Sequence, residues 1–208
     1  LDATDGIFSD WVRWQVEAIR SVDSTHPITV GYNTVFDCLP ANRQLDFISH
    51  HAYQAPVDLE GVMRNLTTLD RLRSVWPDRP ITLGEFGYTN GAIIGGRYLD
   101  LHTSALGEFL HYLYAFSRGF SGCMKWVLTD HPLELSRQQC SWIPPDDLST
   151  HIDQGRYGFF YSNGTGEPQP KPLVWALRFL REDIDAGGGT GDLQVVPAPT
   201  PIGAGYVF

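Results

Sequence analysis

Short apolar segments alternate with longer amphipathic ones along most of this 208-residue chain. The short segments are of strand length and carry apolar residues on both sides of an extended chain: ITVGY (28–32), LDFISHHAY (45–53), ITLG (81–84) and GCMKWVL (122–128). Strands that are buried on both faces are typical of parallel sheets, and parallel neighbours need a crossover connection, usually a helix. The alternation therefore predicts an α/β fold with parallel strands.

Three amphipathic segments have the length of crossover helices, at residues 7–22, 58–75 and 97–118. In each, apolar side chains recur at the spacing of one helical face. The expected buried residues are Phe8, Val12, Val16 and Ile19 in the first segment, Leu59, Val62, Leu66, Leu69 and Leu72 in the second, and Leu101, Ala105, Phe109, Leu113 and Phe116 in the third. Pro172 predicts the first turn of a last helix, where its missing N–H removes no hydrogen bond.

Turn-forming residues divide the C-terminal part of the chain. YGFFYSNGTGEPQPKP (157–172) predicts a hairpin-like excursion with Asn163-Gly164 at its turn. AGGGTG, which begins at residue 186, is typical of a linker, and the segment after it has the character of β structure. We expect one domain over residues 1–185, followed at 186–208 by a glycine-rich linker and a β tail, the start of another domain.

Composition argues against several classes of function. The net charge of −9 disfavours nucleic-acid binding, which needs a basic face against the phosphates. No run of roughly 18 apolar residues occurs, so we expect no membrane-spanning helix. The three cysteines, Cys38, Cys123 and Cys140, show no CxxC spacing and do not predict a zinc site.

Polar and aromatic side chains stand where the predicted strands end. In chain order these residues are Asn33, His51, Tyr53, Glu85 and Trp126. The carboxyl ends of parallel strands meet at one edge of a sheet, where α/β enzymes place their sites. A carboxylate, an imidazole, a phenol and an indole together suit a polar substrate with apolar faces, such as a sugar ring.

Two features of the strands refine this site. Gly84 and Gly87 flank Glu85, which predicts that backbone and substrate approach the carboxylate closely. Side chains alternate along a strand, so His50 and His51 are expected to point to opposite faces. We therefore expect His50 to have a structural role.

The order of these segments is similar to the C-terminal half of a retaining glycoside hydrolase barrel. The pattern is a strand with His-x-Tyr, a helix, a strand with Gly-Glu-Phe-Gly, a helix, a strand with Trp, a hairpin, and Lys-Pro before a helix. It resembles the (β/α)8 clan that contains family 5 cellulases and mannanases. The resemblance covers residues 7–184 and implies half of a TIM barrel, with ITVGY, FISHHAY, ITLGEFG and GCMKWVL as strands 5–8.

The resemblance implies a role for each strand-end residue. Glu85 matches the nucleophile at the end of strand 7, which attacks the anomeric carbon in a retaining reaction. Tyr53 matches a tyrosine that hydrogen-bonds this nucleophile, and His51 matches an imidazole that contacts the substrate. Trp126 matches the aromatic floor beneath the sugar. Further candidates for substrate contact are Asn33, Asp130, His131 and Trp142.

One part of the clan's machinery is missing from the sequence. The clan's general acid/base is the Glu of an Asn-Glu pair at the end of strand 4, and no such pair occurs here. The resemblance therefore implies that strands 1–4, and the acid/base with them, lie upstream of Leu1. Half a barrel alone would leave open sheet edges, so we expect the missing strands to be supplied. The missing half would come from the same polypeptide, a companion chain or a dimer. Without a proton donor to the leaving group, these residues alone are not expected to hydrolyse an unactivated glycoside.

These features predict a retaining O-glycosidase that needs no cofactor and acts on a β-linked polysaccharide, oligosaccharide or glycoside. The choice of sugar stays open, and enzymes of this type are often exported. A non-catalytic sugar-binding barrel is one alternative, and Glu85→Gln separates the two, because a binder would keep its affinity. A metal-dependent hydrolase using His50, His51, Glu85, Asp130 and His131 is another, but the chain has neither an HxH nor an HExxH pair.

Overall fold

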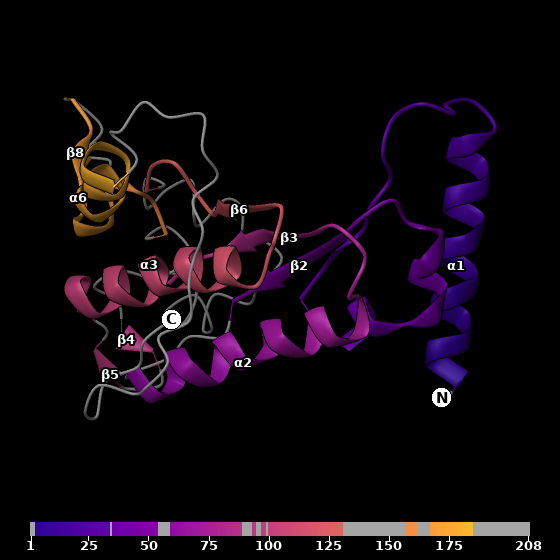
Figure 1. Cartoon of the computed structure of the whole chain (residues 1–208), viewed down its shortest axis with the longest axis horizontal. Coiled ribbons are helices and arrows are strands. Elements are labelled where there is room, and N and C mark those ends of the chain that lie inside the picture. The colour runs from indigo at the N-terminus through magenta and orange to yellow at the C-terminus, as the bar shows by residue number, and fades with distance from the viewer. Residues whose placement is uncertain are drawn as a thin grey trace, which may run out of the picture.

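A four-stranded parallel sheet lies at the centre of the computed structural model (Figure 1). The structure describes residues 3–33, 35–53, 59–88, 93–94, 97–98, 100–130, 157–161 and 167–184. Neighbouring strands are parallel throughout, in the order β1-β2-β3-β6. The strands are β1 (Gly31–Tyr32), β2 (Ile48–Ala52), β3 (Ile81–Phe86) and β6 (Gly122–Lys125). The predicted parallel α/β arrangement is confirmed.

Helices form the crossovers between these strands. Helix α1 (Ala3–Arg20) precedes β1, α2 (Leu59–Val75) joins β2 to β3, and α3 (Leu101–Ser117) lies between β3 and β6. The predicted last helix is α6 (Pro172–Phe179), which begins at its proline and continues as the π-helical turn Leu180–Ile184. In Figure 1, α2 and α3 lie side by side against the sheet, and α1 and α6 stand at opposite ends of the molecule.

Short elements complete the described part of the chain. Two 3-10 turns, η1 (Val35–Cys38) and η2 (Pro40–Gln44), lie between β1 and β2. Two antiparallel ribbons pair β4 (Ile93–Ile94) with β5 (Arg97–Tyr98), and β7 (Phe160–Tyr161) with β8 (Gln169–Pro170). The second ribbon confirms the paired strands of the predicted hairpin. Its Asn163-Gly164 turn and the predicted tail at 186–208 lie outside the described residues.

The main core lies between the sheet and helices α2 and α3. Four predicted residues of α2, Val62, Leu66, Leu69 and Leu72, are at most 1 % exposed and pack with the apolar side chains of β2 and β3. Complete burial of a leucine side chain contributes roughly 1.5–3 kcal/mol, so this face of α2 accounts for much of the attachment of the helix.

The buried face of helix α3 is rotated away from the predicted one. Among the predicted residues, Ala105 is buried, Leu101, Phe109 and Leu113 are half-buried, and Phe116 is 45 % exposed. The other buried residues of this helix are Ser104, Gly107, Glu108, His111, Tyr114 and Ala115. The cause is the size of the side chains opposite: a β-carbon at Gly107 would lie 2.6 Å from the ring of Tyr88, and Phe86 stacks on His111 with ring centroids 5.5 Å apart. Small and polar helix residues make room for these rings.

The start of α3 also differs from the prediction. The helix begins at Leu101, whereas Arg97 and Tyr98 belong to β5. Asp100 is the N-cap, and its carboxylate accepts hydrogen bonds from the backbone N–H groups of His102 and Thr103, both at 2.9 Å. Such a cap satisfies N–H groups that have no partner within the helix, which fixes the helix start.

Helix α1 packs against a second, smaller core. Val12 and Val16 are buried there, with Phe8 packed against the same cluster, as predicted. Ile19 was predicted to join them but is 41 % exposed. The last turn of the helix instead carries Arg20, whose guanidinium donates to the backbone oxygen of His26 at 2.7 Å. A polar turn therefore replaces the apolar layer at this point.

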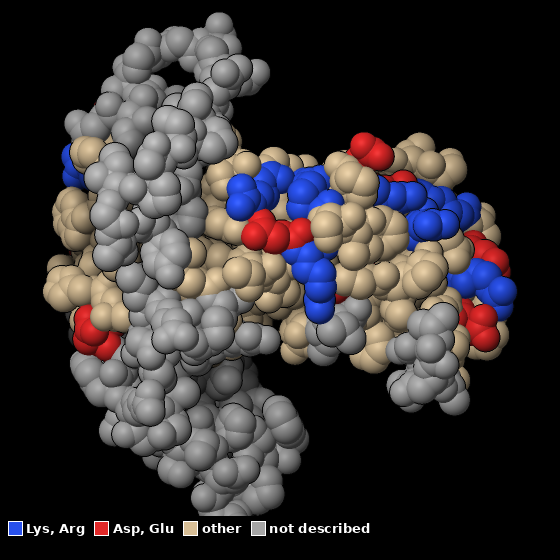
Figure 2. Space-filling model, turned by 60° about the horizontal axis from the view of Figure 1, so that its bottom comes forward, with Lys and Arg blue, Asp and Glu red and all other residues tan. Residues whose placement is uncertain are grey.

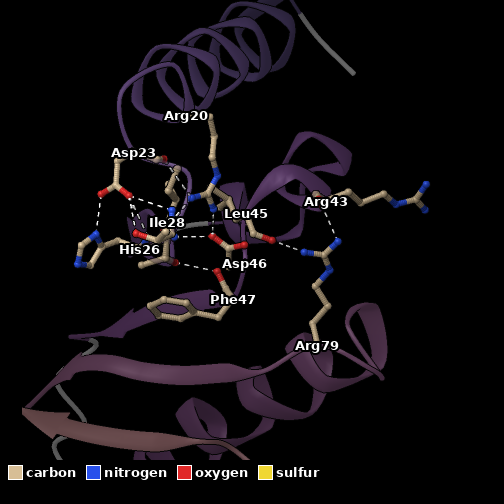
Figure 3. A network of polar contacts seen from close by, with 11 residues as sticks. Arg20, Asp23, His26, Ile28, Arg43, Leu45, Asp46, Phe47 and Arg79 are labelled. Carbon is tan, nitrogen blue, oxygen red and sulfur yellow. Dashed lines mark hydrogen bonds and ion pairs between the residues drawn. The ribbon is translucent and has the colours of Figure 1, made fainter.

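Asp46 joins the end of α1 to the beginning of the sheet (Figure 3). Its carboxylate accepts from the Ile28 N–H at 2.5 Å and from the Arg20 guanidinium. Its own N–H donates to the Ile28 carbonyl at 2.9 Å, while the Thr29 hydroxyl donates to the Phe47 carbonyl at 2.8 Å. At this point side chains replace several of the backbone hydrogen-bond partners of a regular sheet. Strand β1 is correspondingly short and covers only the last two residues of the predicted strand ITVGY.

The described surface carries charges of both signs. On the face in Figure 2, basic side chains have acidic ones close by. Exposed ion pairs include Arg13 with Asp10 and Arg178 with Glu182, both at 2.9 Å. Among the residues that the structure describes, no helix is both long enough and apolar enough to cross a membrane.

Asp46→Asn should weaken the α1–sheet junction at neutral pH and have little effect in acid. The Ile28 N–H, and after it Arg20, hold the pKa of Asp46 below its usual value. A carboxyl group whose pKa is lower in the folded protein than in the unfolded chain, where it is about 3.9, stabilises the fold at pH values above that value. This contribution is lost as the pH falls through the folded-state pKa. The difference in Tm from the wild type, measured by circular dichroism, should narrow as the pH falls below about 4. Asp10→Asn, at an exposed ion pair, is the matched control, and an equal change in both variants would contradict a special role for Asp46.

Candidate active site

The predicted residues gather at the carboxyl edge of the sheet. Tyr53 directly follows β2, Glu85 lies near the end of β3, and Trp126 directly follows β6. Because the strands are parallel and adjacent, these ends share one edge. Asn33 directly follows β1 at the same edge and is exposed.

Strand β3 has an irregularity at Gly84 that decides where Glu85 points. The register with β2 steps from Leu83 to Glu85 across two consecutive residues of β2, so Gly84 is an additional residue. Leu83 and Phe86 are both fully buried in the main core, although strict alternation would put them on opposite faces. The bulge turns Glu85 to the face of His51. Bulges re-aim side chains in this way and are common beside active sites.

Glu85, Tyr53 and His51 form one polar cluster. The Tyr53 hydroxyl donates to Glu85 Oε2 at 2.7 Å, and His51 Nδ1 lies 3.5 Å from the same oxygen. Both contacts involve Oε2, so they orient the carboxylate without using Oε1. The Glu85 side chain is still 34 % exposed, which leaves it reachable by a substrate.

The surroundings keep the two partners of Glu85 in defined protonation states. Burial, reinforced by the bond to Glu85, raises the pKa of Tyr53 well above its ordinary value, so the phenol keeps the proton that it donates. Burial lowers the pKa of His51, although the charge of Glu85 opposes this. His51 is therefore mainly neutral at pH 7.

Glycines make space for this cluster, but for protein atoms rather than for substrate. A β-carbon at Gly84 would lie 2.0 Å from Ser49 Oγ, and one at Gly31 would lie 2.3 Å from His51 Nε2. At Gly87, the nearest atom would be the Trp126 carbonyl oxygen at 2.8 Å. The predicted close approach of backbone is confirmed at Gly87, where the neighbour is the Trp126 carbonyl. The β-carbon positions of Gly84 and Gly87 are not open to a substrate, because protein atoms fill them.

Trp126 lies beside the cluster and is exposed. The residue is 42 % exposed, and its backbone N–H donates to the Phe86 carbonyl at 2.9 Å, which attaches it to the end of β3. Asp130, another predicted candidate for substrate contact, is engaged elsewhere, since it accepts from Lys171 Nζ at 2.6 Å. His131 and Trp142 lie outside the described residues.

Tyr157 belongs to the site but was not foreseen from the sequence. Its ring meets the ring of Tyr53 edge-on, with centroids 5.8 Å apart and planes at 87°. A β-carbon at Gly87 would lie 3.1 Å from it. It comes from the segment before β7, far from Tyr53 in the chain, so no local pattern could have revealed the contact.

Other titratable groups face away from this cluster. His50 points to the opposite face, where Nδ1 lies 2.7 Å from the buried Asp37 carboxylate, as expected for a structural residue. Glu108 is buried on that side too, paired with Lys125. In the described ranges, no group of three or more His, Cys, Asp or Glu side chains is placed to hold a metal ion.

Comparison with known proteins gives a likeness in fold. No family model matches the sequence, and no curated protein matches it. Solved structures of glycoside hydrolases do match. A β-D-glucuronidase from Dictyoglomus thermophilum superposes with a TM-score of 0.53 at 20 % identity, over 85 % of this chain and 29 % of that one.

Two further neighbours have different activities. An exo-β-1,4-mannosidase from an Opitutaceae bacterium has a TM-score of 0.56 at 16 % identity, over 88 % of this chain and 33 % of its own. A family 17 β-1,3-glucanosyltransferase from Rhizomucor miehei has a TM-score of 0.52 at 10 % identity, over 81 % and 56 %. The chain thus shares the fold of TIM-barrel glycoside hydrolases and spans about a third or less of the glucuronidase and the mannosidase.

Gly84→Ala should lower the free energy of unfolding by about 1–3 kcal/mol, the usual cost of overpacking. The added methyl group would collide with Ser49 Oγ. Ser49→Ala removes that hydroxyl and leaves the β-carbon of residue 49 as the nearest neighbour, at 3.4 Å, so the double variant should recover most of the loss. Urea unfolding of the two single variants, the double variant and the wild type measures the coupling. A loss that Ser49→Ala does not relieve would refute this account of the bulge.

Proposed function

We propose that this chain carries the nucleophile of a retaining O-glycosidase, with Glu85 forming the covalent glycosyl-enzyme. The observation that carries the proposal is the cluster at the end of β3, where Tyr53 holds Glu85 at 2.7 Å in a fold shared with glycoside hydrolases. We assign the chain to the clan that contains family 5 cellulases and mannanases. In this assignment it is the C-terminal half of the barrel, with β1, β2, β3 and β6 as strands 5–8.

The reaction has two steps that both involve Glu85. An oxygen of Glu85 attacks the anomeric carbon while the bond to the glycosidic oxygen breaks, and the general acid gives its proton to that leaving oxygen. Water, deprotonated by the same acid/base, then displaces Glu85 and returns it as a free carboxylate. Tyr53 and His51 orient the carboxylate through Oε2 in this scheme.

The acid/base comes from outside the described residues. A retaining reaction needs a second carboxyl group about 5 Å from the nucleophile. The buried candidates Glu108 and Asp37 face the other side of the sheet, each with a basic partner. We propose that the acid/base lies on strands 1–4, supplied by the same polypeptide, a companion chain or a dimer.

The substrate is proposed to be a β-linked polysaccharide, oligosaccharide or glycoside. Trp126 is exposed and its indole suits the apolar face of a sugar, while His51 and Asn33 would contact the hydroxyl groups of the sugar. The names of the glucuronidase, mannosidase and glucanosyltransferase neighbours all specify β-linkages, which supports this choice. The scheme requires no cofactor.

Activated glycosides fluorinated next to the anomeric carbon, with a dinitrophenyl leaving group, should label Glu85. The leaving group needs no protonation, so the absence of an acid/base does not mask the nucleophile. Peptide mass mapping should find one sugar adduct on Glu85 in the wild type and none in Glu85→Gln. If a folded protein binds oligosaccharides with equal affinity in both forms and takes up no label, it is a sugar-binding protein instead.

Tyr53→Phe should slow this labelling by about 10–100-fold, as expected for losing a hydrogen bond to a charged group. The rate is measured from the release of dinitrophenolate. Tyr114→Phe is the matched control, because it also removes a tyrosine–carboxylate bond, to Asp70 Oδ2 at 2.5 Å, but on the side of α2 and α3. Equal losses in both variants would show that Tyr53 acts only on overall stability.

A further inference from the structure

Four charged side chains are buried together behind the strand ends. Lys125 Nζ pairs with Glu108 Oε1, and Lys171 Nζ pairs with Asp130 Oδ1 at 2.6 Å. The exposed fractions of the Lys125, Glu108 and Lys171 side chains are 0 %, 1 % and 2 %, and that of Asp130 is 15 %. These four residues are called the charge quartet below. None of them takes part in the chemistry proposed for Glu85.

Both carboxylates of the charge quartet also hold the backbone near the site. Glu108 Oε1 accepts from the Tyr88 N–H at 2.9 Å, just beyond the segment that carries Glu85. Asp130 Oδ1 accepts from the Gly158 N–H at 2.9 Å, next to Tyr157. Hydrogen bonds to charged acceptors are about twice as strong as neutral ones, so these two carboxylates are firm anchors.

Trp126 lies between two anchored points of the chain. Lys125 immediately precedes it, and Asp130 follows four residues later. Its N–H bonds to the Phe86 carbonyl at 2.9 Å, and a β-carbon at Gly87 would lie 2.8 Å from its carbonyl oxygen and 3.4 Å from Lys125 Nζ. The Glu108–Lys125 pair therefore lies directly beneath the contact between the ends of β3 and β6.

The energetic cost of the quartet argues for a role beyond stability. Burial raises the pKa of Glu108 and lowers the pKa of Lys125 and Lys171, while the opposite charges within the quartet act against these shifts. Glu108 Oε2 is buried and has no hydrogen-bond partner among the residues that the structure describes. Apolar replacements of a buried ion pair are often neutral or stabilising, so the charges are not explained by stability alone.

We propose that the charge quartet is a positioning device that fixes the end of β6, and with it Trp126, against the end of β3. The inference deepens the proposed function, because a sugar stacked on Trp126 would then present its anomeric carbon to Glu85. The positioning itself is a property of the backbone and can be measured without any substrate.

Two variants test the device by hydrogen exchange, read by NMR at single amides. Glu108→Asp keeps every charge but withdraws the carboxylate by one methylene. Glu108→Gln combined with Lys125→Met removes one pair of opposite charges together, which avoids an unpaired buried charge. In both variants, the Tyr88 and Trp126 amides should exchange several-fold to about tenfold faster, the effect of weakening one hydrogen bond.

Controls separate positioning from general loosening. The Ser121 N–H bonds to the Ile81 carbonyl at 2.7 Å, at the opposite end of the same strand pair, and should exchange at the wild-type rate. Asp70→Asn combined with Arg118→Met removes a half-exposed pair at the end of α3 and should leave the Tyr88 and Trp126 amides unchanged. Equal acceleration at Ser121, or unchanged exchange at Tyr88 and Trp126 in the folded variants, would overturn the proposal.

Labelling by the fluorinated glycosides links the device to catalysis. In the two quartet variants, the maximal rate of labelling should fall more than the half-saturating concentration rises, because the sugar still binds but meets Glu85 poorly. If variants with accelerated amide exchange are labelled with the same kinetics as the wild type, the catalytic part of the inference is overturned. If the wild type takes up no label, the proposed function fails, while the exchange measurements still decide whether the quartet positions Trp126.

Discussion

The additional residue at Gly84 allows β3 to direct apolar side chains to the helix face of the sheet and Glu85 to the opposite face. Leu83 and Phe86 both reach the main core, and Glu85 between them turns to the side of His51. The bulge needs a residue without a side chain, because Ser49 Oγ occupies the place of its β-carbon. Both the packing of α2 and α3 and the exposure of the proposed nucleophile follow from this one local irregularity.

The two faces of the sheet differ in their electrostatics. On the site face, Glu85 is partly exposed and is oriented by a protonated phenol and a mainly neutral imidazole. On the helix face, burial lowers the pKa of His111 to about 4, so this ring is neutral where it stacks on Phe86. On the helix face, the members of the charge quartet are buried as pairs of opposite charge. Placing Glu85 at the partly exposed edge avoids the large cost of burying a charge without an opposite partner.

Helix periodicity predicted burial well only where both partners are apolar. In α2 the pattern held, because leucines and valine meet the apolar side chains of β2 and β3. In α3 only Ala105 of the five predicted residues is buried, since the rings of Phe86 and Tyr88 need small and polar residues opposite them. At Ile19 the periodicity failed, because the end of α1 contacts a polar turn and not an apolar layer.

The sequence alone determined the parallel α/β arrangement and the strand ends that carry Tyr53, Glu85 and Trp126. These follow from periodicity and chain order, which are local properties. Only the tertiary structure decided that Glu85 turns toward His51, that Tyr157 meets Tyr53, and that Lys125, next to Trp126 in the chain, forms a buried pair with Glu108. Each depends on atoms brought together from distant segments, and a bulge or a buried ion pair leaves no periodic signal in the chain.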